Sequence, residues 1–245
     1  MIDWHARFLQ QAAWTRRMRE YLFDRSGIAR VRRVLEVGSG TGAILGELGP
    51  GAFTIDGIDH DPLRLFEAQR HVGRARFVCG DALALPYAAR TFDVVFCHYL
   101  LLWVGDPLRA LREMARVTRP GGYVLALAEP DYVHRIDQPP ALAALGRWQT
   151  ESLLRQGADP GIGSRLAGLF REAGLTIIEC GPYQPPPADP GDDEMEWAVL
   201  EHDLAGLVPQ PELDRLKSVD HQARSRGERL LHIPTYFAFG QVSPD

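Results

Sequence analysis

The fold is decided by an apolar run that leads directly into three closely spaced glycines, Val34-Leu35-Glu36-Val37-Gly38-Ser39-Gly40-Thr41-Gly42. The apolar run predicts a short buried strand, and the glycines predict a tight turn at which the backbone can approach a ligand. A helix is expected over 43–48, and the free N–H groups at its N-terminus would face that ligand. Asp59 ends the next apolar run, where a carboxylate can accept both hydroxyl hydrogens of a ribose.

Strand and helix patterns alternate on both sides of this loop. Further strands are predicted at 53–58, 76–79, 92–97, 123–128, 176–180 and 230–242, and helices at 62–71 and 107–119. Such alternation is typical of right-handed βαβ units, in which helices cover both faces of a parallel sheet. We therefore predict an α/β fold with a seven-stranded, mainly parallel, Rossmann-like sheet.

Helical patterns also fill the segments outside this core. The first 28 residues carry apolar side chains near a 3.6-residue period, and further helices are expected at 141–155, 164–173, 192–207 and 212–226. We predict a single domain over 1–245, with a helical cap at 1–28, a ligand-binding core at 30–130, and helical inserts over the active site at 131–175 and 190–228. Trp148 and Trp197 lie in these inserts, where they would either line an acceptor pocket or fill a core.

The composition argues against several classes of protein. The 27 basic and 32 acidic residues give a net charge of −5, without the basic footprint of nucleic-acid binders. No apolar run approaches the ~20 residues that span a bilayer, and the first residues do not read as a secretory signal. Three scattered cysteines and eight unclustered histidines predict neither a metal site nor disulfides, so we expect a cytoplasmic protein.

Taken together, these segments resemble the class I, Rossmann-like methyltransferases that use S-adenosylmethionine (SAM). The nearest resemblance is to the small-molecule branch that includes the ubiquinone/menaquinone-biosynthesis (type 11) enzymes. It covers about residues 30–130, and it rests on the order and spacing of 34–42, Gly57-Ile58-Asp59, Gly80-Asp81-Ala82, Phe92-Asp93-Val94-Val95 and Arg119-Pro120-Gly121-Gly122. The resemblance implies direct displacement of a methyl group from SAM onto a small, apolar metabolite.

The resemblance also implies roles for the residues that would contact the adenosine half of SAM. Asp59 would hold the ribose hydroxyls, and the ring of His60 would lie beside the adenine. Asp81 would accept a hydrogen bond from the adenine amino group, and the backbone N–H of Ala82 would reach the adenine ring.

The methionine half of SAM is expected at the glycine loop. The resemblance implies that Gly38-Ser39-Gly40 lies against it, that Cys97 and His98 lie beside its amino group, and that Glu36 sits just behind the loop. Carboxylates and backbone carbonyls suit a cationic ligand that carries an amino acid and a diol.

A general base is not evident from the sequence. The candidates at the carboxyl edge of the sheet are His98, Glu129 and Asp131, with Tyr99 and His202 as further possibilities. Two alternatives therefore stay open: a SAM-binding regulatory or accessory protein without catalysis, and an NAD-dependent oxidoreductase. The glycine spacing argues against the NAD-dependent oxidoreductase. In the NAD fingerprint G-x-G-x-x-G the third glycine comes three residues after the second, whereas in this chain Gly42 comes two residues after Gly40.

Overall fold

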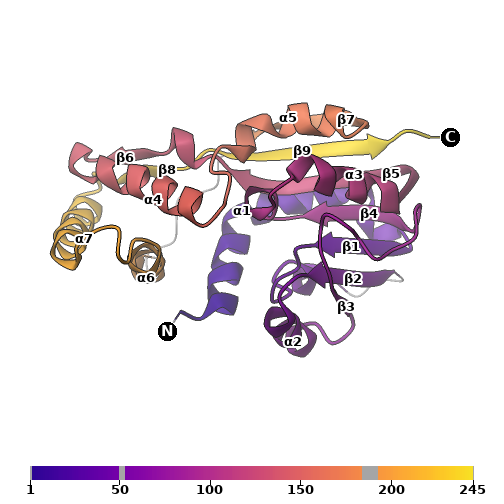
Figure 1. Ribbon diagram of the computed structural model, residues 1–245, viewed down its shortest axis with the longest axis horizontal. Helices are drawn as coiled ribbons and strands as arrows, with labels where there is room; N and C mark the ends of the chain where they lie inside the picture. Colours follow the sequence, from indigo (N-terminus) through magenta and orange to yellow (C-terminus); the bar gives the residue numbers. More distant parts are fainter. Residues whose placement is uncertain (1, 50–52, 184–192, 245) are drawn as a thin grey trace.

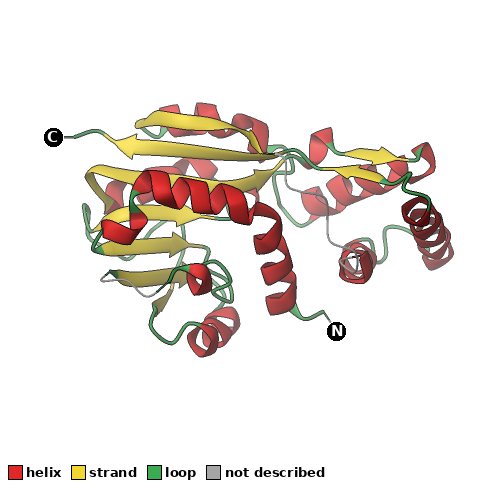
Figure 2. Cartoon of the chain, turned by 180° about the vertical axis from the view of Figure 1, so that it is seen from behind, coloured by secondary structure: helices red, strands yellow, loops and turns green. Residues whose placement is uncertain are grey.

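A seven-stranded sheet forms the body of the molecule. Helices cover both of its faces, and a smaller lobe lies to one side (Figures 1 and 2). The computed structural model describes residues 2–49, 53–183 and 193–244. The strands run in the order β3-β2-β1-β4-β5-β9-β7. They are β1 (Arg33–Val37), β2 (Thr54–Asp59), β3 (Arg76–Cys79), β4 (Phe92–Cys97), β5 (Thr118–Pro130), β7 (Leu175–Tyr183) and β9 (Thr235–Val242). The five strands β1 to β5 pair in parallel and only β9 runs antiparallel to its neighbours, which confirms the predicted fold class.

The strand order reverses between β1 and β4, and this reversal positions the site. From β1 the chain proceeds outward through β2 and β3, then returns to pair β4 on the other side of β1. Val37 at the end of β1 is in register with both Ile58 and Cys97. The residues that follow, Gly38 and His98, therefore emerge side by side at the carboxyl edge, where ligands bind in open α/β sheets.

Two apolar cores cover the two faces of the sheet. On one face, α3 (Pro107–Val117) and α5 (Ile162–Glu172) bury Leu111, Met114 and Phe170. On the other face, α1 (Trp4–Ser26) buries Ala12 and Leu22, next to the segment that follows α2 (Pro62–His71). α3 and α5 thus cover the sheet with an apolar stripe, as amphipathic helices do, whereas the buried face of α1 also carries polar residues.

The helix ends follow the expected capping chemistry. Asp106 accepts a hydrogen bond from the Arg109 N–H, with Pro107 in the first turn of α3. Gly27 ends α1 with φ +64°, a left-handed conformation that glycine adopts without strain. The helix expected over 107–119 ends at Val117, because β5 begins at Thr118 and runs through the Pro-Gly-Gly segment with a shifted register.

The helix expected over 43–48 is wrong. Only one 3-10 turn forms there, η2 (Leu45–Glu47). Gly46, in the middle of this segment, lowers its helix propensity. Pro50 and Gly51, expected to end that helix, lie outside the described residues.

The single strand expected over 230–242 is also wrong. It is divided into β8 (Leu230–His232) and β9, with Pro234 between them. β8 pairs antiparallel with β6 (Ile136–Gln138), a strand that the sequence did not predict, in a separate two-stranded sheet. Proline lacks the backbone N–H that a continuous strand would use for pairing, so the chain leaves one sheet and enters the other here.

The lobe consists of this small sheet with α4 (Ala143–Arg155), α6 (Asp193–Asp203) and α7 (Gln210–Ser225). Figure 1 shows it beyond the ends to which the arrows of β1 and β4 point, with the first turns of α1 alongside. It has its own core, whose buried members are Leu142, Leu145, Trp197, Leu200, Leu204, Val208, Leu213 and Leu216, with Trp148 packed against them. α6 ends at Asp203, four residues before the expected end, and 190–192 lie outside the described residues.

One part of the expected inserts does not belong to the lobe. α5 lies within 131–175, yet it packs on the main sheet against β7 and β9, because Leu166 and Phe170 join the core of that face. Only the stretch from β6 to α4 forms part of the lobe, together with α6, α7 and β8.

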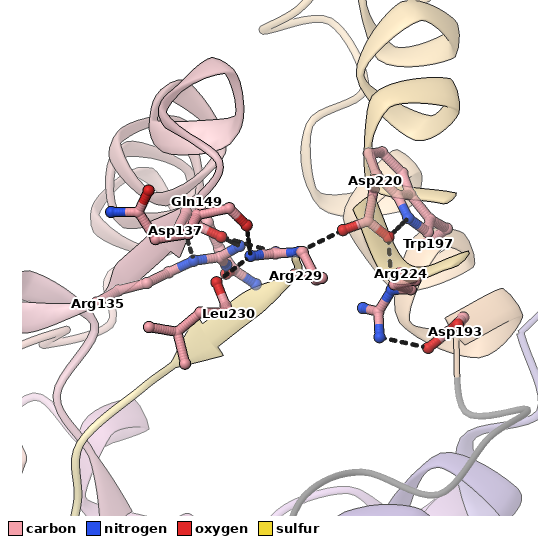
Figure 3. A network of polar contacts seen from close by, with 10 residues as sticks. Arg135, Asp137, Gln149, Asp193, Trp197, Asp220, Arg224, Arg229 and Leu230 are labelled. Carbon is pink, nitrogen blue, oxygen red and sulfur yellow. Dashed lines mark hydrogen bonds and ion pairs between the residues drawn. The ribbon is translucent and has the colours of Figure 1, made fainter. Parts of the chain in front are cut away.

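Buried ion pairs link the segments of the lobe (Figure 3). Asp220 of α7 accepts hydrogen bonds from Trp197 Nε1 at 3.0 Å and from Arg224 Nε at 2.7 Å. Arg229 bridges Asp220 and Asp137, donating to Asp137 Oδ1 at 2.8 Å, and both carboxylates are buried. Removing either partner of such a pair would leave an uncompensated buried charge and so destabilise the lobe.

Candidate functional site

The glycine loop after β1 is held in a conformation that only glycine adopts freely. Gly38, Gly40 and Gly42 have φ values of +75°, +50° and +81°. A Cβ on Gly38 would lie 2.7 Å from Leu100 Cδ1, so a larger residue has no room there. The N–H groups of Gly38 and Ser39 donate to the Ile58 carbonyl at 2.8 and 3.0 Å, which ties the loop to the end of β2.

Asp59 is fixed against this loop from the neighbouring strand. Its Oδ2 accepts the Gly40 N–H at 2.8 Å and its Oδ1 accepts the Asp61 N–H at 3.0 Å. The N-cap of α2 is Asp61, which accepts from the N–H groups of Leu63 and Arg64. Asp59 therefore does not cap the helix, and its buried carboxylate keeps lone pairs for a ligand at the sheet edge.

Two buried polar atoms at the loop have no hydrogen-bond partner among the described residues, Ser39 Oγ and Glu36 Oε2. Ser39 and Glu36 are only 4% and 2% exposed. Burial raises the pKa of Glu36 well above its ordinary value, although the positive charge of Arg19 opposes this. Unpaired buried polar atoms are rare and cost about 1–3 kcal/mol each, so a polar ligand at the loop would satisfy groups that the protein leaves unsatisfied.

The expected adenosine-contacting residues meet at the same edge. β2 and β3 pair with Asp59 opposite Cys79, and the Gly80 N–H donates to the Asp59 carbonyl at 3.0 Å. The exposed His60 ring lies with Nδ1 3.4 Å from Asp59 Oδ1. Asp81 is exposed, and its Oδ1 accepts the Leu83 N–H at 2.8 Å. This hydrogen bond closes a turn that contains Ala82. The structure thus brings together residues that lie in separate segments of the sequence.

Cys97 and His98 leave the end of β4 in different directions. Cys97 is fully buried in the apolar core, with Sγ 4.0 Å from Glu129 Oε1, and burial raises its pKa. His98 lies toward α1, where its Nε2 is 2.8 Å from Thr15 Oγ1. Burial, with Arg19 nearby, lowers the pKa of His98 well below its usual value. The imidazole is therefore neutral at physiological pH.

Glu129 and Asp131, two candidate bases, each hold a local turn of the backbone. Glu129 is fully buried, and its oxygens accept the N–H groups of Leu100, Leu101 and Leu102 at 3.0, 2.9 and 3.3 Å. Asp131 is also fully buried, and it accepts the His134 N–H at 3.3 Å while pairing with His134 Nδ1 at 2.9 Å. These contacts hold each carboxylate at its own turn of the backbone.

The burial of Glu129 predicts a pH dependence of stability. Burial raises the pKa of Glu129 from 4.5 to about 7, with the three backbone N–H groups lowering it in part. The folded protein therefore holds this proton more tightly than the unfolded chain, and the free energy of unfolding falls as the pH rises from about 4.5 to 7. The fall is roughly 3 kcal/mol. We expect Glu129→Gln to flatten this slope in urea titrations at pH 5 and 8, whereas the exposed Glu67→Gln should leave it as in the wild type. An equal slope in E129Q would contradict the assignment.

The first turns of α1 cover the glycine loop through contacts that the expected helical cap at 1–28 did not specify. His5 Nδ1 lies 2.7 Å from Thr41 Oγ1, and the His5 ring stacks on His71 with centroids 3.6 Å apart. Phe8 packs against Gly40, and Arg7 pairs with Glu196 of the lobe at 2.9 Å. α1 therefore contacts both the loop and the lobe.

Thr15 and Arg19 are further functional candidates that the sequence analysis missed. Both are fully buried on the face of α1 that also carries Ala12 and Leu22. Positions 12, 15, 19 and 22 follow helical spacing, so polar residues at 15 and 19 interrupt an otherwise apolar stripe. That interruption is the sequence feature that could have identified Thr15 and Arg19 as candidates.

Neither a metal site nor a membrane span is found in the part of the chain that the structure describes. Its histidine, cysteine and carboxylate side chains form no group of three that could hold a metal ion. Its helices are all too short or too polar to cross a membrane.

Comparison with known proteins identifies relatives of the core. The methyltransferase domain family matches residues 35–126. The chain is 34% identical to a demethylmenaquinone methyltransferase of Roseiflexus castenholzii over 182 residues, which cover 71% of each protein. It is 37% identical to the corresponding enzyme of Renibacterium salmoninarum over 108 residues, and 36% identical to a malonyl-[acyl-carrier protein] O-methyltransferase of Halorhodospira halophila over 138 residues. These last two matches cover 44% and 53% of this chain, and they span about half of the relatives' own lengths, 46% and 47%.

Solved structures share the whole fold. A chain of the complex between the Haloferax volcanii Trm112 methyltransferase activator and a methyltransferase superposes with a TM-score of 0.65. The match covers 98% of this chain and 95% of that one at 19% sequence identity, so it speaks for the fold alone.

Proposed function

Because the chain belongs to the class I, Rossmann-like family of SAM-dependent methyltransferases, we propose that it transfers a methyl group from SAM to a small-molecule acceptor by direct displacement. The observation that carries the proposal is the glycine loop, at which Ser39 Oγ and Glu36 Oε2 are buried without a partner in the described part of the chain and the Asp59 carboxylate is fixed alongside. These groups suit a ligand that carries an amino acid at one end and a diol at the other.

Different residues at the sheet edge would contact different parts of SAM. Asp59 would hold the ribose hydroxyls, while His60, Asp81 and Ala82 would contact the adenine. The loop 38–40 would receive the amino-acid half, with the unpaired oxygens of Ser39 and Glu36 in reach of it.

Methyl transfer from SAM would need little acid or base catalysis. When bound, SAM would supply a methyl group on a sulfonium, whose sulfur would leave as a neutral thioether that needs no protonation. Glu129 and Asp131 are occupied by backbone contacts, so the protein's contribution would be alignment of the acceptor and exclusion of water. The first turns of α1, which cover the loop, are placed to exclude that water.

The acceptor that we propose is a small, apolar metabolite rather than a nucleic acid. The net charge of −5 supports this, since nucleic-acid binding relies on a basic surface. The relatives are named for demethylmenaquinone and malonyl-acyl-carrier protein, two different acceptors, so the names do not identify the acceptor of this chain. We also propose a cytoplasmic location, supported by the three free cysteines.

Thermal unfolding with ligands tests the cofactor. S-adenosylhomocysteine (SAH) at about 100 times its Kd should stabilise the fold by about 2.7 kcal/mol, since it binds only the native state. For a chain of this size that is roughly 5–10 °C in Tm. NAD at equal concentration is the control, and a shift with NAD but none with SAH would contradict the proposal.

Turnover separates an enzyme from a SAM-binding accessory protein. We expect a labelled product when the protein is incubated with deuterated-methyl SAM and cell extract, detected by mass spectrometry. The matched control is Gly38→Val, which has no room beside Leu100. Tight SAH binding without any labelled product would favour the accessory role.

A further inference from the structure

A buried hydrogen-bond chain joins α1 to the glycine loop edge. Arg19 Nη1 donates to Thr15 Oγ1 and to the Ala12 carbonyl. Thr15 Oγ1 lies 2.8 Å from His98 Nε2. The far end of the Arg19 guanidinium is anchored on Glu47, to which Nε donates at 3.1 Å. Arg19 and Thr15, in the middle of this chain, are both fully buried, whereas Glu47 and His98 at its two ends are partly exposed.

The protons along this chain can be assigned from the donors and acceptors. Arginine can only donate, so Thr15 Oγ1 accepts from Arg19. The hydroxyl proton of Thr15 then has two targets, His98 Nε2 at 2.8 Å and the Ala12 carbonyl at 3.5 Å. The Ala12 carbonyl already accepts from Arg19, and 3.5 Å is long for a hydroxyl donor. The shorter contact favours a proton directed to His98, in which case Nε2 is an acceptor.

We propose that Thr15 is a positioning residue that fixes His98 with its proton on Nδ1, so that the ring donates this N–H to the carboxylate of the methionine half of SAM. The identity of the ligand rests on the proposed function. His98 stands beside Gly38 at the sheet edge, because β1 and β4 pair with Val37 opposite Cys97. A ring that offers a proton cannot accept one from the ligand's ammonium group, so an oxygen is its matching partner.

This proposal differs from two expectations for His98. The side chain would not face the amino group of SAM, because two donors would then meet. It would not serve as a general base either, since Nε2 is occupied by Thr15 and Nδ1 already carries the proton. The guanidinium of Arg19 nearby further favours the neutral ring.

The tautomer can be read directly in the ligand-free protein. In nitrogen-15 NMR spectra of the imidazole, we expect the wild type to show a protonated Nδ1 and an unprotonated Nε2 for His98. Thr15→Val removes the hydroxyl with little change in size, and we expect a mixture of tautomers or the proton on Nε2. Thr15→Ser keeps the hydroxyl and should give the wild-type spectrum. A wild-type spectrum with the proton on Nε2 would overturn the proposal, whether or not T15V folds.

Isothermal titration calorimetry then tests whether His98 contacts the carboxylate of the ligand. We expect T15V to bind SAH roughly tenfold more weakly than the wild type and T15S do, as expected when one charge-assisted hydrogen bond is lost. Decarboxylated SAM keeps the amino group but lacks the carboxylate, so the wild type and T15V should bind it equally. Unchanged SAH affinity in T15V, or an equal loss for both ligands, would overturn the carboxylate assignment. Failure of the wild type to bind SAH at all would instead overturn the proposed function, and the tautomer would still be decided by the spectra.

Discussion

Replacing Asp59 by alanine is expected to weaken SAH binding by about 2–3 kcal/mol, which is roughly 30- to 160-fold in Kd. The carboxylate would hold the ribose hydroxyls, and its Oδ2 also accepts the Gly40 N–H at 2.8 Å. The variant therefore loses both the ligand contact and the acceptor that fixes the loop. The measurement is isothermal titration with SAH on wild type and D59A.

A neighbouring aspartate supplies the control. Asp61 lies at the same edge, but its side chain caps α2 through the N–H groups of Leu63 and Arg64. D61A should cost about 1 kcal/mol of stability, as the loss of an N-cap does, while SAH affinity stays close to that of the wild type. Equal SAH affinity in D59A and wild type would mean that Asp59 serves only the loop.

The second large effect is expected in the lobe. Trp197 is 1% exposed, and its Nε1 donates to the buried Asp220 at 3.0 Å. Trp197→Ala should lower the free energy of unfolding by about 3–5 kcal/mol, because it opens a cavity and removes a hydrogen bond from a buried carboxylate. The exposed Trp103 is the matched control, and W103A should change stability by less than about 1 kcal/mol. Chemical denaturation of both variants makes the comparison.

This measurement decides between the two roles considered for the tryptophans. The structure places Trp197 in the lobe core and packs Trp148 against it, which favours the core role over a pocket wall. SAH affinity of folded W197A should therefore match that of the wild type, since the lobe core lies apart from the glycine loop. A variant with normal stability and lost turnover would show that Trp197 contacts the acceptor.

Local chemistry made most of the sheet predictable. The strands at 76–79 and 92–97 and the helix at 62–71 have the expected bounds. Each has a strong local signal, such as a continuous apolar run or an aspartate-proline start that favours only a helix N-terminus. The turn at the glycine loop was predictable for the same reason, because its three closely spaced glycines favour the positive φ values that the loop adopts.

Contacts between distant segments were not predictable. The three-residue strand β6 forms only because β8 pairs with it, and nothing in Ile136–Gln138 signals a strand. Glu129 resembled a candidate base in the sequence, yet it stabilises the turn at Leu100–Leu102 from another strand. The same holds for His98, whose proton position depends on Thr15 in α1. Such partners are set by tertiary packing, which no local pattern encodes.

The place of β9 in the sheet constrains how the protein is made. β9 lies between β5 and β7, although it follows both in the chain, and it is the strand that joins β7 to the rest of the sheet. While the ribosome has delivered β7 but not yet β9, the edges of β5 and β7 have no partner of their own. Open edges of this kind pair readily with other chains. The nascent protein is therefore exposed to aggregation until its 235–242 segment inserts, and chaperones that shield strand edges should matter most in that interval.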